Sequence, residues 1–327
     1  TNIRSKALIG TVIPLNDIAY VENNFITNVA ILMINYLILN RIKKVEIAGL
    51  DGYQIGKGNY AYDETNMASN ENLFEELNKK TIDLIVSEAR NLAIKEILPT
   101  FKDGDEIGCK LADGKVTVPE SFKRAWKLYC EGEWLAMCDD PAVGGQGMPK
   151  MLSSMFEEMA FAANSSFALY TILNTGATLT LSQHGSEELK QTYLPKMYEG
   201  RWTGTMCLTE SHAGTDLGMI KSRAVPGEDG SYTITGTKIF ITAGEHDLSE
   251  NIIHLVLAKL PDAPAGPRGI SLFLVPKLAV GNDGELNGEL NNVSCGSIEH
   301  KMGIRASATC VMNFDQSRGF LVGELNK

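Results

Sequence analysis

One segment of the chain combines hydroxyl, carboxylate and imidazole side chains with a glycine, directly after an apolar run. It reads Thr205-Met206-Cys207-Leu208-Thr209-Glu210-Ser211-His212-Ala213-Gly214-Thr215-Asp216. A strand that enters such a turn offers free backbone N–H groups, and the glycine lets a ligand approach the main chain. The segment can therefore cradle the polar edge of a ring or a phosphate, although a turn with one glycine is more often only a turn.

The cysteines and histidines give no sign of a metal site or a disulfide framework. No C-x-x-C pair occurs, and no histidine lies at metal-ligand spacing from a cysteine. We expect reduced thiols and, for His254 inside an apolar run, a hydrogen-bonded core residue. His184, His246 and His300 have no partner at catalytic spacing. The six cysteines are Cys109, Cys130, Cys138, Cys207, Cys295 and Cys310.

Charge excludes some classes of partner. The 327 residues carry a formal net charge of -10, without a long run of Lys or Arg, which argues against nucleic acid and anionic membranes. The longest apolar stretch, Ile26 to Leu39, is interrupted by asparagines and is too short for a membrane span. It also lacks the flanks of a signal peptide. We expect a cytoplasmic protein with a small or acyl ligand.

From Glu71 to residue 199 the sequence has the periodicity of helices. Residues 24–47 show no clean period and receive no assignment. A helical pattern runs to Pro99, and a turn-rich piece follows from Asp103 to Pro119. Helical patterns return at 121–137 and at 149–199, where breaks are expected at Asn174-Thr175-Gly176 and at His184-Gly185, with Ser186 as an N-cap.

From Trp202 the pattern changes to short β-prone runs between glycine, aspartate and proline turns. Their number and spacing predict a sandwich or a barrel. The fold class is therefore α+β and multidomain, with an all-α domain at 1–201 and an all-β middle domain at 202–327. The expected strands are Thr203 to Thr209, Ser222 to Pro226, Tyr232 to Thr242, Asn251 to Lys259, Ile270 to Lys277, Gly296 to Lys301 and Ser307 to Asp315.

Four segments in order along the chain resemble signatures of the acyl-CoA dehydrogenase family. Cys207 to Asp216 looks like its C-V/L-T-E-P-x-A-G-S-D loop, and Gly236 to Gly244 resembles its G-x-K-x-W/F-I-T/S-x-G/A strand. Lys301 to Thr309 is similar to its K-M/L-G-x-R/K-x-S-x-T turn, and Pro141 to Pro149 to its P-x-x-x-G-G-x-G-x-P loop. The resemblance covers residues 90 to 325.

Two further segments indicate a branch of this family. Gly-Glu-His-Asp at 244–247 and Pro-Asp-Ala-Pro at 261–264 look most like the large-subunit, 3-methylmercaptopropionyl-CoA dehydrogenase-like branch.

The resemblance implies FAD as cofactor and assigns residues of the first loop to it. Met206, Leu208 and Thr209 match positions that line the isoalloxazine ring, where the main chain and hydroxyl of Thr209 bond its polar edge. Gly214 and Thr215 match positions near the flavin pyrophosphate or the pantetheine arm, which makes Thr215 a substrate-binding candidate as well.

The second segment supplies three more cofactor-binding candidates. Phe240, Ile241 and Thr242 match the strand beside the dimethylbenzene side and the N5 region of the flavin. The loop departs from the family pattern at two places, because Ser211 replaces a proline and His212 a small residue. Both changes put the rigidity of the turn in doubt.

The reaction that the resemblance implies is α,β-dehydrogenation of an acyl-CoA thioester to a trans-2-enoyl-CoA, as in fatty acid and lipid metabolism. A carboxylate removes the α-proton, and a hydride leaves the β-carbon. In the family that base is a glutamate of a C-terminal four-helix domain, and none of the glutamates here matches it. We therefore expect no catalytic base in this chain, a base beyond Lys327, and a truncated dehydrogenase that is inactive alone and binds FAD weakly or not at all.

Other readings remain open. The chain could be a non-catalytic flavin- or acyl-CoA-binding module, or a partner subunit that completes another chain. It could also be a relative such as an acyl-CoA oxidase or an alkylation-response flavoprotein. For the full-length form, the resemblance implies an electron-transfer flavoprotein as electron acceptor and a homo-oligomer.

Overall fold

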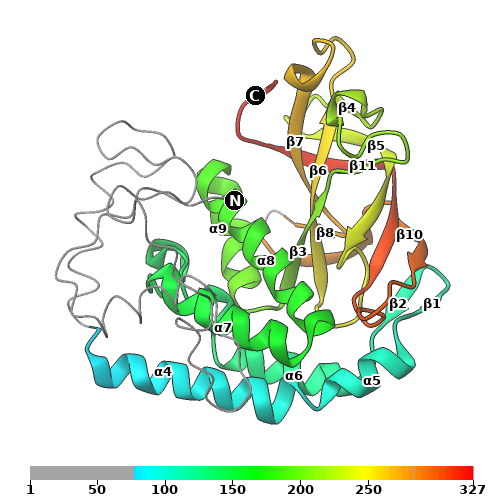
Figure 1. The fold of residues 1–327 in the computed structure, drawn as a ribbon. Helices are drawn as coiled ribbons and strands as arrows, with labels where there is room; N and C mark the ends of the chain where they lie inside the picture. Colours follow the sequence, from blue (N-terminus) through cyan, green and yellow to red (C-terminus); the bar gives the residue numbers. More distant parts are fainter. Residues whose placement is uncertain (1–76, 282, 327) are drawn as a thin grey trace, which may run out of the picture. The chain divides into compact units, whose positions relative to one another are not determined.

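Figure 1 shows the fold as a ribbon; this computed structural model describes residues 77–281 and 283–326. The described residues belong to one compact unit, with helices first along the chain and most strands after them. This order confirms the expected fold class. The segment 24–47 and the apolar stretch Ile26 to Leu39 lie outside the described residues.

The helical part contains six α-helices in the described range, and side-chain caps define where three of them begin. Asn78, Asn164 and Ser186 each accept a hydrogen bond from a backbone N–H of the first turn. The N-cap expected at Ser186 is thus confirmed. The helices are α4 (Lys79–Leu92), α5 (Thr100–Ile107), α6 (Glu120–Glu131), α7 (Lys150–Ala163), α8 (Ser165–His184) and α9 (Glu187–Tyr198).

Of two helix breaks that the sequence predicted, one is confirmed and one is wrong. The run that begins with α4 continues through a π-helical turn, Ala93–Ile97, and ends before Pro99, which is the N-cap of the next helix, α5. Asn174-Thr175-Gly176 does not interrupt α8. The polar side chain of Asn174 instead docks this helix, since Nδ2 donates to Met197 O and Oδ1 accepts from Gly204 N.

The β part is a seven-stranded sheet that closes on itself. Its order is β10-β11-β5-β4-β6-β3, and β7 pairs with both β11 and β6, which joins the sheet into a barrel. The structure therefore confirms the predicted sandwich or barrel and shows that it is a barrel. The strands are β3 (Trp202–Cys207), β4 (Arg223–Pro226), β5 (Tyr232–Thr242), β6 (Asn251–Lys259), β7 (Ile270–Pro276), β10 (Val293–Glu299) and β11 (Thr309–Val322).

Two small hairpins were not foreseen. β1 (Lys110–Ala112) and β2 (Lys115–Thr117) pair within the helical part, around the turn at Asp113-Gly114. β8 (Leu278–Val280) and β9 (Leu286–Leu290) pair in the β part. Both pairs are too short to show an alternating pattern in the sequence.

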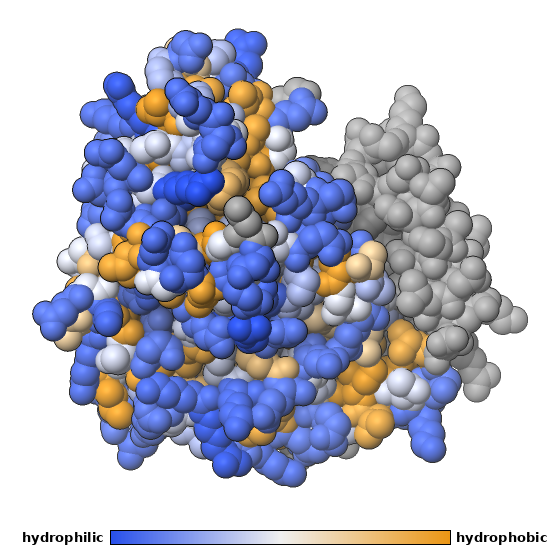
Figure 2. Space-filling view, turned by 180° about the vertical axis from the view of Figure 1, so that it is seen from behind, coloured by the Kyte–Doolittle hydropathy of each residue, from blue (hydrophilic) through white to orange (hydrophobic). Residues whose placement is uncertain are grey.

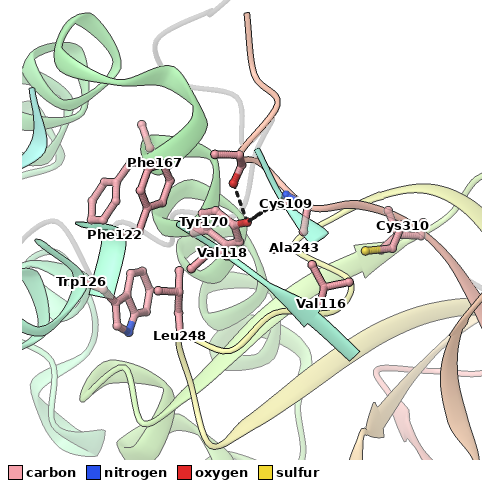
Figure 3. Close-up of a cluster of buried hydrophobic side chains, with 14 of the residues drawn as sticks. Cys109, Val116, Val118, Phe122, Trp126, Phe167, Tyr170, Ala243, Leu248 and Cys310 are labelled. Atoms are coloured by element: carbon pink, nitrogen blue, oxygen red, sulfur yellow. Dashed lines mark hydrogen bonds between the residues drawn. The ribbon is translucent and has the colours of Figure 1, made fainter. Parts of the chain in front are cut away.

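Helices and strands share their hydrophobic cores. One buried cluster includes Phe122, Trp126 and Phe167 of the helices together with Ala243 and Cys310 of the barrel (Figure 3). A second cluster joins α8 and α9 to β3, β6 and β7. Because the same side chains bury both parts, the helices hold the barrel in a fixed orientation.

One face of the described surface is largely hydrophilic (Figure 2). Figure 2 shows blue side chains over most of one face, with hydrophobic ones in separate patches. Between residues 77 and 326, no described helix has the length and apolarity that a bilayer span requires.

Candidate functional site

The loop after β3 and the end of β5 lie side by side, so the structure brings the two motif segments together. Ile239 N donates to Thr209 O at 2.9 Å, and Thr205 Oγ1 donates to Thr242 O. These bonds run directly between the two segments. Any ligand that contacts the loop at Thr209 therefore also lies near the end of β5.

A buried ion pair fastens the same two segments, and our sequence interpretation missed it. Lys238 Nζ lies 2.9 Å from Glu210 Oε1 and 3.0 Å from Leu208 O. The two side chains are 0% and 5% exposed. The signal was present, because Lys238 follows Ile234 and Gly236 at the inward positions of an alternating strand, where a charge needs a partner.

Glu210 also organises the loop that follows it. Its two carboxylate oxygens accept from the backbone N–H of Lys221 and of Ser222 and from Ser222 Oγ, at 2.6–3.0 Å. Burial works against the charge of Glu210, but the bonds from Ser222 and Lys221 and the Lys238 ammonium outweigh it and lower the pKa to about 2. Glu210 is therefore ionised and is a poor acceptor for a substrate proton.

The loop that departs from the family pattern is held by hydrogen bonds of its own. His212 Nε2 lies 3.1 Å from Met219 O, a bond across the loop that a small residue at this position could not make. Asp216 Oδ1 accepts from Gly218 N at 2.9 Å, and Lys259 Nζ donates to Gly218 O at 2.6 Å. Ser211, which replaces the motif proline, is exposed.

The end of β5 contains a β-bulge with an unusual backbone. Opposite β11, Lys238 pairs with Met312 and Ile241 with Cys310, so Ile239 and Phe240 face a single residue. Phe240 has φ 59°, a left-handed conformation that is costly for an aromatic residue. The bulge turns the Phe240 side chain outward, where it is 49% exposed.

Its neighbours in the motif point in different directions. Ile241 is 2% exposed and belongs to the core, so its side chain packs inside the protein. Thr242 is half-buried, as are Met206 and Leu208, which share one face of the chain. Of the predicted cofactor-binding side chains, Ile241 alone is directed away from this surface.

Several donors at this surface have no partner within the described residues. The hydroxyls of Thr209, Thr215 and Thr242 make no hydrogen bond to another described residue, and neither does the Thr209 N–H. Gly214 and Thr215 are exposed, and Gly214 lies in an open part of the loop. These groups can bond a ligand without breaking any bond in the protein.

The third motif contacts this surface, and the glycine-rich loop folds onto itself. Lys301 Nζ lies 4.9 Å from the centre of the Phe240 ring, a cation–π contact between the third motif and the second. In the glycine-rich loop, Gly147 N and Met148 N donate to Asp139 O and Met137 O, which folds the loop back onto its own start.

The buried histidines are structural, as expected for His254. Burial lowers the pKa of His254 and of His246 to about 3, so both rings are neutral. His254 Nδ1 lies 3.7 Å from Cys207 Sγ, and His246 Nε2 lies 3.1 Å from Thr203 Oγ1. All six cysteines are free, and among the described residues no cluster of His, Cys, Asp and Glu could hold a metal ion.

The sequence matches known families over both parts of the chain. Residues 79–201 match the N-terminal domain of acyl-CoA dehydrogenases, and residues 205–317 match the middle domain. The 3-methylmercaptopropionyl-CoA dehydrogenase of Ruegeria pomeroyi is 49% identical over 230 residues, which are 70% of this chain and 39% of that protein. A butyryl-CoA dehydrogenase of Syntrophomonas wolfei is 41% identical over 235 residues, 70% of this chain and 38% of that protein.

Solved structures share the fold. An acyl-CoA dehydrogenase from Bacillus anthracis, complexed with FAD, superposes with a TM-score of 0.62 at 24% identity, covering 77% of this chain and 38% of that one. The chain thus spans about two fifths of the relatives that it matches. With both domain matches in order and the same helix-then-barrel fold, the chain belongs to the acyl-CoA dehydrogenase family.

Proposed function

We propose that this chain supplies the flavin-binding wall and part of the acyl-CoA-binding wall of an FAD-dependent acyl-CoA dehydrogenase. The observation that carries the proposal is the junction of the loop at Leu208–Thr215 with the bulge at Ile239–Thr242, where unpaired donors and exposed apolar groups meet. We place the division between the helical and the β domain at residues 201 and 202.

The residues present fit a flavin. An isoalloxazine ring has a polar edge and two apolar faces, and the junction offers Thr209 N–H and hydroxyl donors beside the apolar side chains of Met206 and Leu208. Thr242 and Phe240 extend this surface, and the exposed loop at Gly214 and Thr215 presents free N–H groups of the kind that bind a pyrophosphate. We assign FAD to these residues.

In the proposed reaction an acyl thioester loses a proton from Cα and a hydride from Cβ, and bound FAD supplies the acceptor for that hydride. The part of this chain is to orient the ring and the thioester and to exclude water between them. Thr209 holds the polar edge of the ring, and Thr215 is placed to bond the pantetheine arm. Glu210, with its lowered pKa, acts as a fixed anion within the wall rather than as a base.

The substrate and the acceptor are part of the same proposal. The relatives act, by their names, on 3-methylmercaptopropionyl-CoA and butyryl-CoA, so we expect a short acyl-CoA here. We expect an electron-transfer flavoprotein to accept the electrons.

Titration with FAD tests the proposal. We expect the purified protein to bind FAD weakly but in a saturable way, and to quench flavin fluorescence in titrations carried to high protein concentration. In preparations that bind FAD, addition of butyryl-CoA or 3-methylmercaptopropionyl-CoA should perturb the visible flavin band, whereas free coenzyme A should perturb it less. Protein that is folded but shows no saturable interaction with FAD would contradict the assignment of this surface.

A further inference from the structure

We propose that Lys238 is a positioning residue that strengthens the Thr209 N–H as a hydrogen-bond donor, by binding the carbonyl oxygen of the same peptide group. The inference rests on the proposed flavin site and adds a residue that does not itself touch the ligand.

The geometry singles out one peptide group. Lys238 Nζ donates to Leu208 O at 3.0 Å, and the carbonyl of Leu208 shares its peptide unit with the N–H of Thr209. A cation on the carbonyl draws electron density from the N–H, and this polarisation is larger in a buried, low-dielectric site. Lys238 is 0% exposed, so its charge is not screened by solvent.

The peptide is also fixed in direction. The next carbonyl, Thr209 O, accepts from Ile239 N at 2.9 Å, and the Thr209 N–H has no acceptor among the described residues. Thr209 therefore presents an unpaired donor between two anchored carbonyls. A donor held in this way costs little ordering entropy when a ligand binds.

Glu210 makes the arrangement possible. An unpaired ammonium could not remain charged at this depth, and Glu210 Oε1 lies 2.9 Å from Lys238 Nζ. The carboxylate is held in turn by Ser222 and by the Lys221 N–H. The pair as a whole is neutral, but the ammonium alone contacts the Leu208 carbonyl.

The experiment compares three variants of the full 327-residue chain. Lys238→Met leaves Glu210 without its partner and is expected to be unstable. Lys238→Met with Glu210→Gln removes both charges, restores a neutral core and still lacks the bond to Leu208 O. Lys277→Met is the matched control, because it breaks the ion pair with Glu245, whose carboxylate is 4% exposed, outside the junction.

Two measurements are made on each variant. In isotope-labelled protein without ligand, the carbonyl chemical shift of Leu208 should move in the double variant toward that of a carbonyl without a cationic donor, and should stay unchanged in Lys277→Met. In FAD titrations the double variant should bind up to about threefold more weakly, because the Thr209 N–H bond is weakened but kept, with a shifted visible flavin band.

The outcomes separate this inference from the proposed function. An unchanged Leu208 shift, or wild-type FAD affinity and spectrum in the double variant, overturns the role of Lys238. A wild-type chain that binds no FAD overturns the flavin site itself, and the role of Lys238 toward FAD with it. Loss of FAD binding in Lys277→Met to the same degree would show a general effect of broken ion pairs and would also overturn the inference.

Discussion

The hydroxyl of Tyr170 donates to the carbonyl oxygen of Ala306 at 2.8 Å, and it accepts from the N–H of Ala308 at 2.9 Å (Figure 3). A side chain of helix α8 thus replaces the backbone partners that the turn before β11 lacks. Cys109 Sγ lies 3.6 Å from the same hydroxyl. Because Tyr170 is fully buried, no water can take its place.

Tyr170→Phe should therefore destabilise the protein by about 2–3 kcal/mol, because two buried main-chain groups lose their partner. Denaturant unfolding measures the change. Tyr193→Phe is the control: Tyr193 is also buried, but its hydroxyl makes no hydrogen bond to another described residue, and a loss below about 0.5 kcal/mol is expected. Equal losses for the two variants would contradict this role of Tyr170.

Acid should weaken the fold through Glu210. Its pKa falls from 4.5 to about 2 in the folded protein, so the folded state favours the charged form more than the unfolded state does. The stabilisation is present above the unfolded pKa and is lost as pH falls through the folded pKa. Between pH values of about 5 and 2, the free energy of unfolding of the Lys238→Met/Glu210→Gln double variant, which leaves no unpaired charge, should change less than that of the wild type. Equal changes in the free energy of unfolding of the two proteins over this pH range would contradict the prediction.

At Phe240, the glycine variant should be more stable than the alanine variant, which is the reverse of the order at an ordinary strand residue. With φ 59°, Phe240→Gly should be about 1 kcal/mol more stable than Phe240→Ala, since glycine adopts this backbone without strain. At exposed Thr235 on the same strand, the glycine variant should be the less stable one. Thermal unfolding of the four variants gives the comparison, and the same order at both sites would argue against strain at Phe240.

Removing the Thr209 hydroxyl should affect the ligand and spare the fold. The hydroxyl has no partner among the described residues, so Thr209→Val should leave the free energy of unfolding within about 0.5 kcal/mol of the wild type. FAD should bind about three- to tenfold more weakly, the loss of one hydrogen bond. Thr235→Val serves as the control for both measurements, and unchanged FAD affinity in Thr209→Val would remove Thr209 from the site.

Alanine substitution should change the stability of the protein in opposite directions at two glycines of the helical part. A Cβ on Gly145 would lie 2.2 Å from the carbonyl oxygen of Asp139, so Gly145→Ala must open the glycine-rich loop and lower stability. A Cβ on Gly176, inside α8, meets nothing within 4 Å, and Gly176→Ala should stabilise the protein by up to about 1 kcal/mol. Calorimetry distinguishes the two; a stable Gly145→Ala would mean that the loop tolerates displacement.

The sequence by itself determined the order of the parts and the position of the motifs. Alternation in the Tyr232 to Thr242 run and the capping serine at Ser186 are local signals, because side-chain alternation and helix caps depend on residues a few positions apart. The first two motif segments likewise marked residues that the structure brings together at the junction of β3 and β5, and the third contacts it through Lys301.

Tertiary structure alone decided how these segments meet. The unbroken helix at Gly176 and the Lys238–Glu210 pair depend on contacts between residues that are far apart in the chain. A polar residue such as Asn174 reads as a break by local propensity, yet its bonds to Met197 and Gly204 make it a docking point. Burial changes the free-energy cost of a charged or amide side chain, and which side chains are buried is decided only when the chain folds.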